Sequence, residues 1–345
     1  MNTRIRFVIL SIAMSSFMAS HAAAQWKWTP ETGRFVNLKS MPKETPELQV
    51  DHARSLMLQG RYRDALNETE KFEKFYGSSE EADENQFLRG EIELFDEAYV
   101  DAAEEFQKVV TSYPDSPLYD DVIAKQYEIG DRMFERGRET EAKRENTSAW
   151  EFGFFRHRFG KRHYKHAIDV YAMVIGNQPF TEEAAQAQYK VGRCHFARGK
   201  YMESAFEYRR VLEDYARSEW VTDAGYGLAR SYEEMSLEPS HDQVPSYLAI
   251  EAVEDFVIRY PADARVGPLS AMSDAMFEKI AEQRYRTAKF YERRQKIDSA
   301  RVYYEITAGK FFGTRAAGKA EVWLEAHPHV ERAAPSFIGS SVSRL

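Results

Sequence analysis

The sequence predicts an all-α fold, a right-handed superhelical solenoid of about six helical hairpins that ends in a C-terminal capping helix. One observation is a recurring pattern: an aromatic residue, a small residue three positions later, and a second aromatic fourteen after the first. Another is the period of 37 residues between two copies, typical of stacked helical hairpins. A third is the recurrence of apolar residues at steps of three and four within each copy. The clearest copies are Tyr62/Ala65/Tyr76, Tyr99/Ala102/Tyr113 and Tyr201/Ser204/Tyr215.

Residues 1–24 have the layout of a secretory signal peptide and are left out of the fold. Arg4 and Arg6 precede an apolar run over residues 7–19, and three alanines at 22–24 form a cleavage pattern. The apolar run is too short to span a bilayer. We therefore expect cleavage before Gln25, with a retained membrane anchor as the alternative.

Residues 25–46 are expected to be extended. Trp26 and Trp28 alternate with polar residues, and Pro30, Gly33 and two further prolines argue against a helix. The two tryptophans are either a docking peptide for a partner or pack on the first repeat, and the sequence leaves both open.

The repeats occupy residues 47–327. In the second repeat, the first helix (helix A) carries an apolar stripe, with Gly90 allowing a close approach of its partner. The second helix (helix B) runs from Tyr99 to Tyr113, where Pro114 ends it. The first-aromatic positions of the six repeats are 62, 99, 164, 201, 246 and 297, although Ser246 and Ile297 replace the aromatic residue in the last two.

The period is broken most strongly in the third repeat, where about 28 extra residues form an insertion at about 138–163. After the sixth repeat, residues 316–326 are expected to form a closing helix, and residues 328–345 a disordered tail. Residues expected to cover the last repeat are Ala316, Ala320, Val322, Trp323 and Ala326.

Composition excludes several classes of protein. The chain has 47 Lys+Arg, 55 Asp+Glu and a formal net charge of −8, which argues against a general nucleic-acid binder. The single cysteine, Cys194, excludes an internal disulfide. The fold must therefore be stabilised by packing.

The repeat pattern resembles the tetratricopeptide repeat (TPR), with glycine before the turn, an aromatic residue opening helix B and a small residue three later. Within it, residues 249–261 (AIEAVEDFVIRYP) and 279–294 (KIAEQRYRTAKFYERR) resemble the last repeat of BamD-type proteins. That family is a lipoprotein subunit of the outer-membrane β-barrel assembly machine. This chain differs in having Ala24-Gln25 where the family has its lipid-carrying cysteine, and about six repeats instead of five.

The resemblance implies a non-catalytic periplasmic scaffold that binds outer-membrane assembly components or unfolded barrel clients. It also implies export across the inner membrane, with membrane association only through partners or the insertion. The alternative is another periplasmic TPR adaptor that coordinates envelope or cell-wall processes. In this class helix A faces the groove that binds peptides, and helix 284–294 would dock the barrel subunit.

Three groups of residues are candidates for partner binding. The insertion is basic and aromatic, and these residue types dominate binding hot spots; the alternative is that its aromatic residues pack on the solenoid. The second group follows from the phase of the helix A repeats, and the third from the BamD-like helix. The candidates are Trp150, Phe154, Phe155, Arg156 and Arg158; Gln86, Arg89, Glu93, Gln126, Lys190 and Arg193; and Arg284, Arg293 and Arg294.

The sequence contains no phosphate-binding loop, nucleophile elbow, zinc motif or triad order. His157, His163 and His166 fit no compact metal-ligand spacing. Cys194 and His195 are neighbours whose side chains diverge by about 100° on a helix, so core packing is expected. We therefore expect no enzyme activity, cofactor or metal site.

Overall fold

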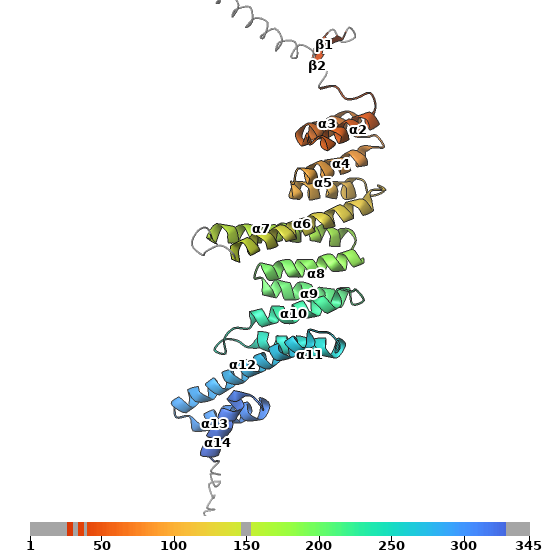
Figure 1. Ribbon diagram of the computed structural model, residues 1–345. Helices are drawn as coiled ribbons and strands as arrows, with labels where there is room; N and C mark the ends of the chain where they lie inside the picture. The colour runs from red at the N-terminus through yellow and green to blue at the C-terminus, as the bar shows by residue number, and fades with distance from the viewer. Residues whose placement is uncertain (1–25, 30–33, 38–39, 146–152, 329–345) are drawn as a thin grey trace, which may run out of the picture. The chain divides into compact units, whose positions relative to one another are not determined.

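Figure 1 shows a computed structural model, which describes residues 26–29, 34–37, 40–145 and 153–328. The chain divides into two compact units, residues 1–179 and 180–345. None of the helices in these ranges is long and apolar enough to cross a membrane.

The N-terminal unit contains a two-stranded antiparallel sheet and three helical hairpins, α2/α3, α4/α5 and α6/α7. Trp28 pairs with Phe35 in the sheet and is half exposed. The elements are β1 Trp26–Thr29, β2 Arg34–Asn37, α2 Pro46–Leu58, α3 Tyr62–Tyr76, α4 Ala82–Phe95, α5 Tyr99–Ser112, α6 Tyr119–Glu145 and α7 Gly153–Asn177.

The C-terminal unit contains three further hairpins, α8/α9, α10/α11 and α12/α13, and the closing helix α14. Its helices are α8 Glu182–Ala197, α9 Tyr201–Asp214, α10 Val221–Met235, α11 Val244–Arg259, α12 Val266–Arg293, α13 Ile297–Lys310 and α14 Arg315–Ala326. Within the described residues, the predicted all-α helical-repeat fold is confirmed, with the small sheet as an addition.

Helix B begins at the predicted first residue in four repeats: Tyr62, Tyr99, Tyr201 and Ile297. In the third repeat α7 begins at Gly153, well before Tyr164, and α6 continues to Glu145. The described residues of the insertion therefore lengthen both helices of one hairpin.

A glycine on helix A packs against an aromatic ring on helix B in several repeats. A Cβ atom on Gly90 would lie 2.7 Å from the Phe106 ring, and one on Gly192 would lie 2.7 Å from the Tyr208 ring. Contacts this short do not occur between real side chains, so only glycine lets the two helices approach this closely.

Helix α14 closes the last hairpin through Trp323. The Trp323 ring stacks on Tyr304 with ring centroids 4.2 Å apart, and its Nε1 donates to Glu292 of α12 at 2.9 Å. Ala316 and Ala320 are buried as predicted, whereas Val322 is 67% exposed and Ala326 is also exposed. The expectation for these last two residues was wrong: Val322 points about 100° away from Trp323, and Ala326 is the last residue of the helix.

The predicted signal peptide and the predicted disordered tail beyond Pro328 lie outside the described residues, as does Trp150. Phe154, Phe155, Arg156 and Arg158 lie within the bounds of α7, but their side chains are not described. Their role in partner binding stays a prediction.

Candidate protein interface

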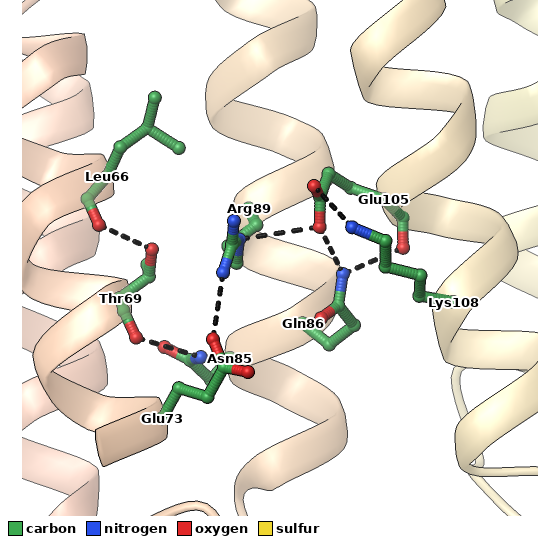
Figure 2. A network of polar contacts seen from close by, with 8 residues as sticks. All are labelled: Leu66, Thr69, Glu73, Asn85, Gln86, Arg89, Glu105 and Lys108. Carbon is green, nitrogen blue, oxygen red and sulfur yellow. Dashed lines mark hydrogen bonds and ion pairs between the residues drawn. The ribbon is translucent and has the colours of Figure 1, made fainter. Parts of the chain in front are cut away.

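A polar network joins α3, α4 and α5 in the N-terminal unit (Figure 2). The Arg89 guanidinium lies 3.1 Å from the Glu73 carboxylate and 3.4 Å from that of Glu105. Gln86 Nε2 donates to the Glu105 carboxylate at 2.6 Å and to its backbone oxygen at 2.9 Å. Lys108 Nζ lies 2.9 Å from Glu105. Glu105 is therefore the centre of the network.

The pKa values of Glu105 and of Glu93, one turn along α4 from Arg89, are shifted in opposite directions. Burial acts to raise the pKa of Glu105, but hydrogen bonds from Lys108 and Gln86 and the charge of Arg89 outweigh burial and lower it. Burial raises the pKa of Glu93, and the charges of Asp101 and Glu105 add to the effect. The surroundings of Glu105 thus favour its charged form, whereas those of Glu93 disfavour the charged form.

These contacts place Gln86 and Arg89 on the side of α4 that faces α3 and α5, which we call the B side. The repeat phase had put them on the peptide-binding side. Gly90 packs on Phe106 of α5 and so fixes the rotation of α4, and Gln86, four residues earlier, shares that side. The predicted partner-binding role of Gln86, Arg89 and Glu93 remains untested.

A glutamine–glutamate hydrogen bond across the hairpin recurs in three repeats at a separation of 19 residues. Gln49 Nε2 donates to Glu68 at 2.8 Å, Gln86 to Glu105 at 2.6 Å, and Gln188 to Glu207. The signal was present in the sequence: each glutamine lies 13 residues before the first aromatic position and each glutamate six after it. The sequence reasoning missed these pairs because it followed apolar positions.

Gln126 of α6 is fully buried in a cluster of three amides on α5, α6 and α7. Its Nε2 donates to Gln107 at 2.8 Å, and Asn177 Nδ2 donates to both Gln107 and Gln126 at 3.0 Å. Gln126 therefore joins helices within the unit, and none of its surface is exposed to a partner in this arrangement.

The surface of α4 between α2 and α6, here called the A face, carries different residues. Arg54 of α2 donates to Glu84 at 2.6 Å. Burial raises the pKa of Glu91, which is near Lys125 and Arg54. Among the described residues no ion pair to Glu91 is formed, so this half-buried carboxylate can accept hydrogen bonds from a ligand. Sequence reasoning did not single out Glu84 or Glu91.

On α8, Arg193 is the equivalent of Glu91 on α4, counted from the glutamines Gln188 and Gln86. Its guanidinium lies 5.9 Å from the Tyr189 ring, which stacks on Trp220. Arg193 thus has the position of Glu91 in its own repeat, and Lys190 is half-buried on the same helix. Partner binding by either residue stays a prediction.

The described base of the lengthened α6/α7 hairpin borders a hollow of about 300 Å³ lined by Tyr99, Arg136, Arg162, His163 and His166 among others. Arg136 lies 4.4 Å from the Tyr99 ring centroid and pairs with Glu97. Burial, followed by neighbouring arginines, lowers the pKa of both histidines. The part of the chain with described side chains holds no group of three or more potential metal ligands.

The C-terminal end of the chain is strongly basic. Residues 279–319 hold 11 Lys+Arg and 4 Asp+Glu, a net charge of +7 within a chain of −8. Arg293 and Arg294 are exposed at the end of α12, where Arg294 lies 4.4 Å from the Phe290 ring centroid, and Arg284 is half-buried. The arrangement suits electrostatic contact with an acidic partner.

Cys194 is fully buried and His195 is half-buried, and burial lowers the pKa of His195. The Cys194 side chain has no access to solvent, so the pair offers no exposed nucleophile.

Comparison with protein families matches two segments to tetratricopeptide-repeat models, residues 50–117 and residues 186–218. No curated protein matches the chain. Among solved structures, a thermophilic TPR protein of Thermus thermophilus is 14% identical with a TM-score of 0.31, covering 66% of this chain and 98% of the other. A tetratricopeptide repeat protein of Parabacteroides merdae is 11% identical with a TM-score of 0.31, covering 80% and 96%. PilW, a type IV pilus biogenesis factor, is 15% identical with a TM-score of 0.25, covering 81% and 99%.

The matched segments include the hairpins α2/α3, α4/α5 and most of α8/α9. Repeats of this kind generally serve as non-catalytic protein-interaction scaffolds. Because two segments match these repeat models, the chain carries tetratricopeptide repeats within a fold of stacked helical hairpins.

Proposed function

We propose that this protein is a non-catalytic periplasmic scaffold of BamD type, which assists the assembly of outer-membrane β-barrel proteins by holding other proteins on its repeats. The observation that carries the proposal is the final repeat. Its sequence from 279 to 294 resembles the last helix of that family, and it lies on α12, a helix of 28 residues that is followed by the shorter α13. The signal-peptide pattern of residues 1–24 supports export.

The basic end of α12 gives the proposal a mechanism. Arg293 and Arg294 are exposed and near other cations, so their charges attract an acidic surface before close contacts form. Exposed charges of this kind mainly set the association rate and the choice of partner. We therefore expect binding through this end to weaken as salt rises.

The test is mild crosslinking in envelope extracts of the source cells, followed by purification of the tagged protein and identification of what comes with it. The proposal predicts a β-barrel assembly subunit in the purified material. It also predicts that Arg293→Glu with Arg294→Glu removes that subunit, whereas the control, Arg63→Glu with Arg217→Glu at exposed sites elsewhere, retains it.

A purified set that contains cell-wall or division proteins and no outer-membrane assembly component would overturn the assembly role. It would favour the alternative, a periplasmic adaptor for another envelope process.

A further inference from the structure

A cleft of about 450 Å³ lies between α9, α10 and α11 in the C-terminal unit. Its lining includes Leu212 of α9, Gly225 and Leu228 of α10, and Ala252 and Phe256 of α11. These side chains are apolar or absent, and we call them the floor of the cleft; most of the other lining residues are charged or carry a hydroxyl group. Hollows of this size and character are typical of ligand sites.

The cleft can be matched residue by residue to the N-terminal unit. Ser79 N donates to Tyr76 O, and Ser218 N donates to Tyr215 O, 139 residues later. Helices α4 and α10 then begin at the same offset, at Ala82 and Val221. The ends of α5 and α11 match at an offset of 147, since Tyr113 N bonds Val109 O and Tyr260 N bonds Phe256 O.

With these offsets, the cleft occupies the place of the polar network in Figure 2. Gln86 and Arg89 correspond to Gly225 and Leu228, Glu105 to Ala252, and Glu73 to Leu212. The four polar side chains that fill the space between α3, α4 and α5 are thus replaced by three smaller or apolar residues and a glycine. The cleft is open because the network is missing.

The walls of the cleft carry charges that are not used inside the protein. Glu213 lies on one wall, and Glu251 and Asp255 on the other, and all three are exposed. Within the described residues, no ion pair to any of these carboxylates is formed. Of the two guanidiniums on the lining, Arg209 donates to the Tyr232 hydroxyl, and Arg259 lies at the end of α11. The walls thus carry three carboxylates and two guanidiniums, an excess of one negative charge.

The apolar surface continues beyond the cleft along α9. Met202 and Phe206 are 69% and 60% exposed. They share the helix face of Arg209 and Glu213, because the spacings of four, three and four residues follow the helix repeat. Exposed large apolar residues grouped beside a hollow are typical of protein-interaction sites.

We propose that this cleft binds a polypeptide segment in which a large apolar side chain is flanked by lysine or arginine. The apolar side chain enters the floor between Leu212, Leu228 and Ala252. The basic neighbours pair with the carboxylates on both walls, in the way that Arg89 pairs with Glu73 and Glu105 in the other unit. The proposal rests on the scaffold function proposed above and names the chemistry of one partner segment.

The sharpest test transplants the protein's own network into the cleft, as Leu212→Glu, Gly225→Gln, Leu228→Arg and Ala252→Glu in the full chain. Binding is measured by fluorescence anisotropy with short labelled peptides in which a central leucine or phenylalanine is flanked by lysines, or by glutamates in the matched peptide. The wild type is expected to bind the lysine-flanked peptides about tenfold more tightly than the glutamate-flanked ones. The transplanted variant is expected to lose this binding.

A second variant guards against a transplant that does not fold. Glu251→Lys with Asp255→Lys changes only the exposed wall and is expected to reverse the preference between the two peptides. The matched control is Glu321→Lys with Glu325→Lys on the exposed face of α14, with the same spacing and charge change. The control is expected to bind as the wild type does.

Three results would overturn the proposal. One is a wild type that binds neither peptide or both equally, and another is binding that survives both cleft variants. A third is a wild type that self-associates in light scattering while the Glu251/Asp255 variant is monomeric, since the occupant would then be a second copy. The scaffold function is tested separately by the crosslinking experiment. If the crosslinked partners are lost with the α12 variant but retained with the cleft variants, the scaffold function holds even though the cleft proposal fails.

Discussion

The two sets of helices α3–α4–α5 and α9–α10–α11 share the backbone hydrogen bonds of their first turn and of the end of their last helix but have opposite interiors on the B side. In the first, Glu105 holds Arg89, Gln86 and Lys108 around it. In the second, Ala252 stands at the same place beside a cleft of about 450 Å³. The repeat fold therefore tolerates both a filled and an open space between neighbouring B helices. A few side chains decide which surfaces are structural and which are free to bind.

The largest effect on stability is expected from Glu105→Ala, which removes the centre of the network. Arg89 would keep only Glu73, and Gln86 only the backbone oxygen of residue 105, so we expect the free energy of unfolding to fall by about 2 kcal/mol. Ala252→Glu at the equivalent place is expected to change it by less than about 1 kcal/mol, because the cleft is open to water. Urea unfolding followed by circular dichroism measures both. Equal losses in the two variants would show that the network does not stabilise the first set.

A second test opens the network to the size of the cleft, with Gln86→Gly and Arg89→Leu together. These are the residues that the second set has at the same positions. We expect a loss of about 1–2 kcal/mol, since Glu105 keeps Lys108 as a partner. Hydrogen exchange of α4 and α5 should rise, while that of α10 and α11 stays as in the wild type. Unchanged exchange in α4 would mean that apolar packing alone holds these helices.

The two sets should also differ in how their stability depends on pH, because Glu93 in the first set corresponds to Tyr232 in the second. The pKa of Glu93 is raised in the folded protein, so its ionisation opposes folding as pH rises above the unfolded value of about 4.3. Glu93→Gln is expected to raise the free energy of unfolding at pH 7 by about 0.5 kcal/mol and to change it little at pH 3. A gain of equal size at both pH values would contradict the assignment to charge.

The smallest effect is expected where both sets have the same exposed ion pair. Arg61 lies 2.6 Å from Asp64, and Lys200 lies 3.5 Å from Glu203 at the equivalent place. Asp64→Asn and Glu203→Gln are each expected to change the free energy of unfolding by less than about 0.5 kcal/mol. A larger change in only one of them would reveal a further difference between the two sets.

The sequence predicted the helical hairpins well because helix B repeats its aromatic and small residues at fixed spacing. Tyr62, Tyr99 and Tyr201 are the first residues of their helices. The rotation of helix A was harder to predict. It depends on the contact of Gly90 with Phe106, and Gln86 and Arg89 consequently face α3 and α5.

The candidate site could be predicted only in part. Gln126, a candidate for partner binding, is buried among amides, and the binding role of Arg193 stays a prediction. The cleft could not be predicted from a repeating pattern. It arises because Gly225, Leu228 and Ala252 stand where the α4/α5 hairpin has three larger polar side chains. Such an absence is recognised only after the repeats are aligned on their backbone hydrogen bonds.

The closing helix has a consequence for how long the array can grow. Trp323 covers Tyr304 and bonds Glu292, and the opposite face of α14 presents Glu321, Val322 and Glu325 to water. A further hairpin stacked on this face would have to bury two carboxylates that have no basic partner there. The outer face of helix α14 therefore disfavours end-to-end association of the protein through its last described repeat.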